Sequence, residues 1–202
     1  NLEVSFDFSK SWMYGNELIT LKPHFYPTDS LTLDAKSMTI NDVYVIRSGI
    51  HIPLKYTYDG QMLHIALDRA YRGEENYTLL IDYIAKPDEV KAKGSAAISG
   101  AKGLYFINPQ GKDKEKPTQI WTQGETESNS SWVPTIDKPN QKTTDEISMT
   151  VPAKFVTLSN GLLVKQKKNA DGTRTDTWKM NLPHAPYLMM MAAGEFSVIK
   201  DR

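Results

Sequence analysis

The sequence predicts an all-β fold, a curved, saddle-like β-sandwich of mostly antiparallel strands. Hydrophobic residues alternate with polar ones at a period of two in segment after segment. Tight-turn dipeptides separate these segments at short intervals, as in a sandwich or a broad open sheet. No stretch of ten or more residues has the period of an amphipathic helix. We therefore expect residues 1–202 to form a single domain, with two sheets that curve around a shared core.

The alternation begins at the amino end and recurs through the first half of the chain. A strand with one buried face requires this spacing, because successive side chains point to opposite faces. The Asp59-Gly60 dipeptide supplies the positive φ of a hairpin turn. The hydrophobic groups are Leu2, Val4, Phe6 and Phe8; Ile19 and Leu21; Leu31, Leu33 and Ala35; Leu63, Ile65 and Leu67; and Tyr77, Leu79, Ile81 and Tyr83.

Two polar segments, residues 87–103 and 108–117, interrupt the pattern and are predicted to be exposed loops. Alternation resumes afterwards, and a second Asp-Gly turn, Asp171-Gly172, separates the last strands. The basic run at residues 165–168 is predicted to be one solvated arm of a hairpin. The hydrophobic groups here are Ile147, Met149 and Val151, and then Trp178, Met180 and Leu182.

Composition excludes several classes of protein. The 24 basic and 24 acidic residues cancel, so the chain carries no electrostatic footprint for nucleic acid. Cysteine is absent, which excludes disulfides, Cys-ligated zinc and thiol nucleophiles and leaves the compartment undecided between cytoplasmic and exported. No apolar run approaches the roughly 18 residues of a membrane span. The first residues lack a signal-peptide pattern and an initiator Met, as in a processed or excised chain.

Most motifs that carry chemistry are missing. None of the four histidines is spaced three or four residues from another, so a helical His-Glu-x-x-His zinc motif is absent. Phosphate-binding glycine loops and a serine nucleophile elbow are absent as well. His64 lies on the polar face of its strand, and the pairs Glu74-Glu75 and Asp88-Glu89 lie in polar turns, where solvated surface is the better interpretation.

Residues 123–140 differ from the other loops. This segment concentrates carboxylate, amide and hydroxyl side chains between apolar residues, with Trp121 before it and Trp132 and Pro134 within it. A polar loop fixed at both ends is a typical place for binding chemistry. Composition alone also allows ordinary turn chemistry at residues 129–131 and a capping role for Asp137.

The loop resembles one in the N-terminal domain of the M1 family of zinc aminopeptidases, the aminopeptidase N and leukotriene A4 hydrolase group. The likeness rests on Thr-Gln-x-Glu at residues 122–125 and on Pro-x-x-Asp-x-Pro at residues 134–139. Three further motifs follow the family's order: Gly-Leu-Tyr-Phe at residues 103–106, Leu-Ser-Asn-Gly at residues 158–161, and Tyr187-Leu188 followed by Gly194-Glu195-Phe196 as the last strand. Essentially the whole chain is covered.

The resemblance implies roles for particular residues. Glu125 stands where the family binds the free α-amine of a peptide, and an ammonium group suits a carboxylate at about 2.7–2.9 Å. Gln123 stands where the family lines the pocket for the first side chain. Trp132, Pro134, Asp137 and Pro139 stand at loop-shaping positions. The resemblance also predicts a cis peptide bond between Glu125 and Thr126.

The sequence departs from the family at two places. Many relatives carry an Arg where this loop has Ser130 and Ser131, and Cys is common where Thr135 stands. The missing Arg leaves Asn129 or Trp132 to brace the loop.

For the whole protein, the resemblance implies a zinc ion held by two His and one Glu in a downstream catalytic domain of the same polypeptide. That domain would also supply a Gly-x-Met-Glu-Asn strand. Neither element occurs here, so residues 1–202 are expected to be the N-terminal domain alone, binding no zinc and inactive by itself. Its partners would be the catalytic domain and the N-terminus of a peptide substrate. Two alternatives remain: a carbohydrate-binding or adhesion module that uses the four tryptophans, and a non-catalytic scaffold.

Overall fold

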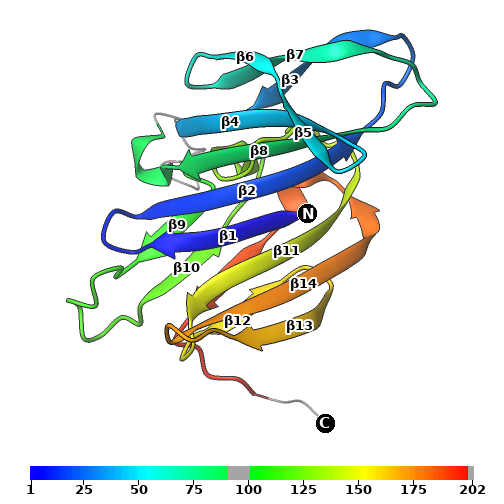
Figure 1. Ribbon diagram of the computed structural model, residues 1–202. Helices are drawn as coiled ribbons and strands as arrows, with labels where there is room; N and C mark the ends of the chain where they lie inside the picture. The colour runs from blue at the N-terminus through cyan, green and yellow to red at the C-terminus, as the bar shows by residue number, and fades with distance from the viewer. Residues whose placement is uncertain (91–100, 200–202) are drawn as a thin grey trace.

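The computed structural model describes residues 1–90 and 101–199, which form three β-sheets (Figure 1). The large sheet has the strand order β13 (Leu162–Lys168), β14 (Thr173–His184), β11 (Thr143–Pro152), β1 (Leu2–Asp7), β2 (Trp12–Leu21), β8 (Tyr77–Ala85), β4 (Met38–Arg47) and β5 (Ile50–Pro53). A four-stranded sheet has the order β12 (Val156–Ser159), β15 (Met191–Gly194), β10 (Gln119–Thr122) and β9 (Leu104–Ile107). A three-stranded sheet has the order β3 (Thr28–Asp34), β7 (Met62–Tyr71) and β6 (Lys55–Tyr58).

The predicted all-β, mostly antiparallel fold is confirmed. The pairing of β1 with β11 is parallel, and the other ladders between described strands are antiparallel. Three short 3₁₀ turns interrupt the strands: η1 (Pro87–Glu89), η2 (Asn129–Ser131) and η3 (Pro186–Leu188). In the described part of the chain, no helix has the length and apolar character needed to cross a membrane.

The expectation of two sheets was wrong, because the described residues form three sheets. Figure 1 shows the four-stranded sheet behind the lower half of the large sheet, with β3, β6 and β7 at its upper end. All three contribute to one contiguous core, to which Ile81 belongs from the large sheet, Leu33 from the three-stranded sheet and Ile120 from the four-stranded sheet. A period of two identifies the buried face of a strand but not the strand beside it.

Several details differ from the sequence-based expectations. Phe8 lies one residue beyond β1, and Leu182 is 70% exposed on β14 although it continues an apolar alternation. Tyr187 and Leu188 form part of η3 and not of the last strand. The loop predicted at residues 87–103 begins with η1, and its residues 91–100 lie outside the described residues.

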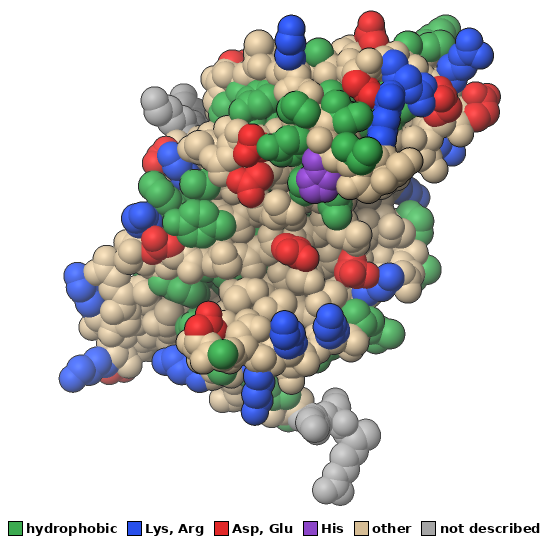
Figure 2. Space-filling view, in the orientation of Figure 1, with side chains coloured by type: hydrophobic (Ala, Val, Ile, Leu, Met, Phe, Trp, Pro, Cys, Tyr) green, Lys and Arg blue, Asp and Glu red, His purple; other side chains and the backbone are tan. Residues whose placement is uncertain are grey.

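The predicted turns are confirmed: Gly60 and Gly172 have φ of 92° and 82°. The basic run ends β13, an edge strand that is exposed throughout. Acidic and basic side chains are interspersed on the face shown in Figure 2, in keeping with the balanced composition.

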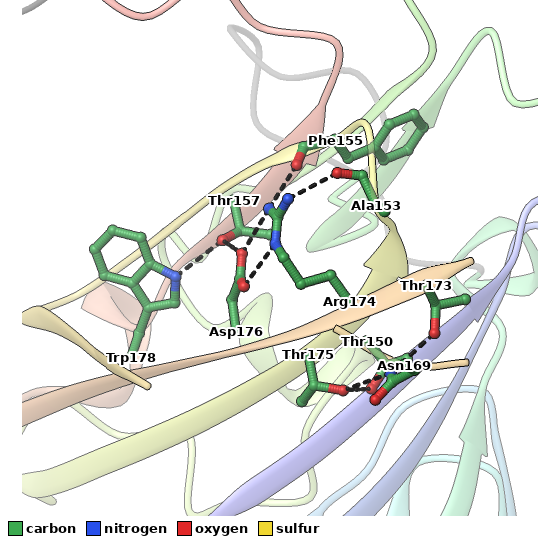
Figure 3. A network of polar contacts seen from close by, with 10 residues as sticks. All are labelled: Thr150, Ala153, Phe155, Thr157, Asn169, Thr173, Arg174, Thr175, Asp176 and Trp178. Atoms are coloured by element: carbon green, nitrogen blue, oxygen red, sulfur yellow. Dashed lines mark hydrogen bonds and ion pairs between the residues drawn. The ribbon is translucent and has the colours of Figure 1, made fainter. Parts of the chain in front are cut away.

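A buried polar network ties the large sheet to the four-stranded sheet (Figure 3). The Arg174 guanidinium on β14 makes two 2.8 Å bonds to the carboxylate of Asp176, which is 1% exposed. Thr157 on β12 donates its hydroxyl to the same carboxylate at 2.7 Å. Arg174 also donates to the carbonyls of Ala153 and Phe155, both at 2.7 Å. Charged groups buried this deeply require partners, and here each has them.

Candidate functional site

Residues 123–140 lie in the connection from β10 to β11, which spans residues 123–142, and their polar side chains divide into buried and exposed groups. Glu125 is exposed, and Gln123 is partly buried with its backbone N–H bonded to the Gly103 carbonyl at 2.8 Å. The predicted cis peptide bond between Glu125 and Thr126 is present. In the described part of the chain, the Glu125 carboxylate has no hydrogen bond and no ion pair.

The neighbouring acidic residue, Glu127, is bonded at both its side chain and its backbone. Its carboxylate pairs with Lys138 at 2.8 Å. Lys36, distant in sequence, donates to the Glu127 carbonyl, a contact that the sequence analysis did not anticipate. With respect to the described residues, the loop therefore presents the Glu125 carboxylate free and the Glu127 carboxylate paired.

Gly124 lets the loop lie against the turn at η3. A Cβ at this position would come within 2.2 Å of the Tyr187 carbonyl oxygen and 2.6 Å of Asn129 Nδ2. Real side chains do not tolerate such approaches, so the residue between Gln123 and Glu125 must be glycine in this arrangement.

Asn129 and Trp132 together brace the loop. Asn129 is fully buried, and its amide nitrogen donates to the Pro186 carbonyl at 2.7 Å and to the Met189 carbonyl at 2.8 Å. The indole N–H of Trp132, also fully buried, donates to Asn129 Oδ1 at 2.8 Å. Either residue was expected to replace the missing Arg, and the structure uses both in one contact chain.

The serines at residues 128–131 are buried and hold the loop's own backbone. Ser131 Oγ lies 2.6 Å from the Ser128 carbonyl oxygen and 2.5 Å from that of Lys102. Ser128 Oγ donates to the Glu125 carbonyl at 3.2 Å. These contacts fix the backbone that follows the exposed Glu125 side chain.

Asp137 lies under the loop at 1% exposure. Its Oδ2 accepts the Ser130 backbone N–H at 2.9 Å, and its own N–H donates to Asp34 Oδ2 at 3.0 Å. Among the described residues its Oδ1 has no hydrogen-bond partner. Burial raises the pKa of the Asp137 carboxyl, against the bond from Ser130 that lowers it.

The remaining candidate residues differ in exposure. Pro134 is buried and Pro139 is exposed. The backbone of Thr135 pairs with Asp34 in an isolated bridge, which joins the loop to β3. Tyr83 donates its hydroxyl to the Trp132 carbonyl at 2.8 Å, which joins the loop to β8.

The four tryptophans do not form an open sugar-stacking row. Trp132 is fully buried, while Trp12 and Trp178 are partly buried. Trp121 is 37% exposed and stacks on Tyr105, with ring centroids 4.5 Å apart. Within residues 1–90 and 101–199, no three His, Cys, Asp or Glu side chains form a group suited to a metal ion.

Comparison with known proteins identifies a family and several similar structures. The family model described as the peptidase M1 N-terminal domain matches residues 1–188. An M1 zinc metallopeptidase from Deinococcus radiodurans is 20% identical with a TM-score of 0.78, the match covering 96% of this chain and 40% of that one. Yeast LTA4 hydrolase is 21% identical with a TM-score of 0.72, covering 96% of this chain and 28% of that one.

A further relative has a different name. Transcription initiation factor TFIID subunit 2 of Gallus gallus is 28% identical over 102 residues, which are 49% of this chain and 9% of that protein. The chain therefore spans less than half of the length of each of these relatives.

Proposed function

Because this chain belongs to the M1 peptidase N-terminal domain family, we propose that it is the N-terminal, substrate-anchoring domain of a zinc aminopeptidase that releases N-terminal residues from peptides. The zinc ion and the catalytic groups lie in a downstream domain of the same polypeptide. In this proposal residues 1–202 supply no zinc ligand and are inactive without that domain.

The observation that carries this proposal is the state of Glu125. Its side chain is exposed and unpaired within the described residues, while the backbone around it is held by Ser128, Asn129 and Gly124. A carboxylate fixed in this way is a receptor for a cation, and the α-ammonium group of a peptide is such a cation. Because an internal peptide bond has no ammonium group, the contact selects chain ends.

Gln123 contributes to the pocket for the first side chain of the substrate. Its backbone is bonded to Gly103, and its partly buried amide lies two residues from Glu125. A neutral amide orients a substrate by hydrogen bonds without adding charge. Trp132, Pro134, Asp137 and Pro139 shape the loop from beneath and at its exit.

The test is a Glu125→Gln substitution in the full-length enzyme that carries this domain. Loss of one charge-assisted bond, about 1.5–3 kcal/mol, predicts a KM for aminoacyl substrates that rises about 10- to 150-fold. Zinc content is expected to stay unchanged, and Glu115→Gln, in the distant exposed loop at residues 108–117, is the matched control.

A substrate analogue without the α-amine separates the role of Glu125 from a general disturbance. Wild type and the Glu125 variant are expected to bind this analogue equally weakly. An unchanged KM for aminoacyl substrates, or loss of zinc from the variant, would show that Glu125 does not hold the amine.

The similarity to the TFIID subunit over 102 residues supports a second candidate, a non-catalytic scaffold. The sequence downstream of residue 202 and the zinc content of the full-length protein distinguish the two. A downstream His-Glu-x-x-His motif with bound zinc favours the peptidase, and the absence of both favours the scaffold.

A further inference from the structure

The strand at one end of the large sheet, β13, is an open edge. In the described part of the chain it pairs with β14 alone, and all seven of its residues are exposed. An antiparallel strand directs the N–H and C=O groups of alternate residues to each side, so β13 presents backbone groups away from β14. The opposite edge strand, β5, has four residues and ends at Pro53, which has no N–H to donate. Of these two edges, β13 is therefore the better one for a further strand.

Three lysines, Lys165, Lys167 and Lys168, make this edge basic. Among the described residues, none of the three forms an ion pair. On the adjacent strand the situation differs, because Lys179 is paired with Glu146 at 3.0 Å. Figure 2 shows basic side chains at the lower end of the face, where Figure 1 places β13 and β14. The edge thus carries positive charge that pairs with no carboxylate of the described residues.

Lys165 and Lys167 lie on one face of the sheet, opposite Thr177 and Thr175 of β14. All four residues line a groove of about 260 Å³, whose one acidic residue is Glu3 of β1. The hydroxyls of Thr177 and Thr175 are each bonded at 2.8 Å to a hydroxyl of β11, and Figure 3 shows that of Thr175. Because the hydroxyls bond to one another, they leave the two ammonium groups to a ligand from outside.

The other half of β13 is apolar. Leu162, Leu163 and Val164 are 74%, 45% and 53% exposed. The register with β14 shifts between Leu163 and Lys165, which marks a bulge where the apolar half meets the basic half. A strand that matches this edge is therefore apolar along one half and acidic along the other.

A second copy of β13 does not meet this requirement. In an antiparallel pair centred on Lys165, the two Lys165 side chains lie opposite each other, and Leu163 lies opposite Lys167. Like charges directly opposite are destabilising. Lysines on an edge strand thus oppose pairing between identical chains. The same lysines attract a strand that carries carboxylates.

We propose that β13 is a docking edge for an extended acidic segment of a separate protein, which adds to the large sheet antiparallel to β13. Carboxylates at alternate positions of the segment face Lys165 and Lys167, and apolar residues follow opposite Leu162 to Val164. Strand addition gives affinity through the main chain and specificity through alternate side chains. Pairing through the backbone selects a polypeptide over other polyanions. The proposal is independent of a catalytic role for the domain.

The first arm of the test is a titration of the isotope-labelled chain with the peptide Thr-Glu-Thr-Glu-Val-Val-Thr, capped at both ends. Antiparallel to β13, its two Glu residues lie opposite Lys167 and Lys165. Amide chemical shifts are expected to change in β13 and β14 and to stay constant in β5. The neutral peptide Thr-Gln-Thr-Gln-Val-Val-Thr is expected to bind roughly 2- to 30-fold more weakly, because two cross-strand charge pairs are lost. The peptide Thr-Glu-Pro-Glu-Val-Val-Thr keeps the charges but not the strand, and is expected not to bind.

The second arm changes the edge itself. Lys165→Gln with Lys167→Gln is expected to reduce the affinity for the acidic peptide to that for the neutral one. Lys112→Gln with Lys114→Gln makes the same change of charge in an exposed loop and is expected to leave the affinity unchanged. An unaltered urea midpoint shows that each variant is folded.

Three outcomes overturn the proposal. An acidic peptide that leaves the β13 amides unchanged at millimolar concentration shows that the edge does not accept a strand. Equal binding of the proline peptide shows attraction of a polyanion without strand pairing. Equal loss of affinity in the two double variants shows that total charge, and not this edge, attracts the peptide.

Discussion

Asn129 is the residue that holds residues 123–140, the candidate anchor loop, against the rest of the domain. Its single side chain satisfies two backbone carbonyls and one indole N–H, all in the interior. Removing the Asn129 amide leaves three buried polar groups without hydrogen-bond partners. Each such group lowers the free energy of unfolding by about 1–3 kcal/mol. The backbone position of Glu125 therefore depends on Asn129, a side chain that is itself fully buried.

We predict that Asn129→Ala lowers the free energy of unfolding by about 3 kcal/mol or more, because the groups it serves lose their partners. Urea unfolding followed by circular dichroism measures the change. Asn76→Ala, at an exposed position, is the control and is expected to change little. A similar cost for both variants would remove Asn129 from its bracing role.

Glu17 predicts a pH dependence with a definite sign. Its pKa is raised from 4.5 to about 8 by burial, so the folded chain holds a proton that the unfolded chain releases. The stabilisation is complete below pH 4.5 and is lost as the pH rises through 8, a change on the order of 5 kcal/mol. Asp137 and Asp145, whose pKa values burial also raises, act in the same direction.

The Glu17→Gln variant isolates this contribution, because its amide does not titrate. Unfolding free energies of wild type and variant at pH 5 and pH 8 give the measurement. The loss between these pH values is expected to be larger in wild type than in the variant. Parallel pH profiles for the two proteins would contradict a buried, protonated Glu17.

At the residue scale, the sequence marked residues 123–140 by their polar composition between tryptophans, and its resemblance to the M1 family singled out Glu125 and Gln123. It also predicted that either Asn129 or Trp132 braces the loop in place of the missing Arg. The partners of Asn129 could not be predicted, since they are the carbonyls of Pro186 and Met189, and every residue has a carbonyl. The burial of Glu17 could not be predicted, because it depends on how β2, β1 and β11 pair in the sheet.

At the scale of elements, β14 carries the polar link between the large sheet and the four-stranded sheet. Arg174 and Asp176 form a bidentate pair in which the carboxylate is almost fully buried. Hydrogen bonds from Arg174 and Thr157 hold the pKa of Asp176 below its usual value, although burial raises it. Removing one member leaves an uncompensated buried charge.

We predict that Arg174→Gln destabilises the domain by about 3–5 kcal/mol, because Asp176 and two backbone carbonyls lose their donor. The double variant Arg174→Met with Asp176→Leu is expected to recover much of this loss. Arg72→Gln, at an exposed position, is the control in the same urea titration. A cost of Arg174→Gln no larger than that of the control would show that the pair does not join the sheets.

Element type followed from the sequence, whereas sheet membership did not. Leu63, Ile65 and Leu67 are buried on alternate positions of β7, as the period predicted. Leu33 and Ile81 have the same signature but belong to different sheets. Leu182 continues an apolar alternation and still faces solvent, because alternation fixes which residues share a face and not whether that face is covered.

At the scale of the whole molecule, one hydrophobic core joins the three sheets. Phe8, just after β1, packs edge-on against Phe106 of β9 with ring centroids 5.7 Å apart. It also packs against Phe155, before β12, at 5.6 Å. The large and four-stranded sheets therefore share aromatic contacts in addition to the Arg174 network, and neither buries its inner face alone.

This shared core predicts that the chain unfolds in a single cooperative transition, since exposing one sheet removes the buried surface of the others. Far-ultraviolet and near-ultraviolet circular dichroism are expected to give coincident urea curves. Phe8→Ala is expected to lower the midpoint by removing about 3–5 kcal/mol while keeping one transition. Two separated transitions in wild type would mean that the four-stranded sheet folds as its own unit, and the candidate anchor loop, which leaves β10, would then depend on that sheet alone.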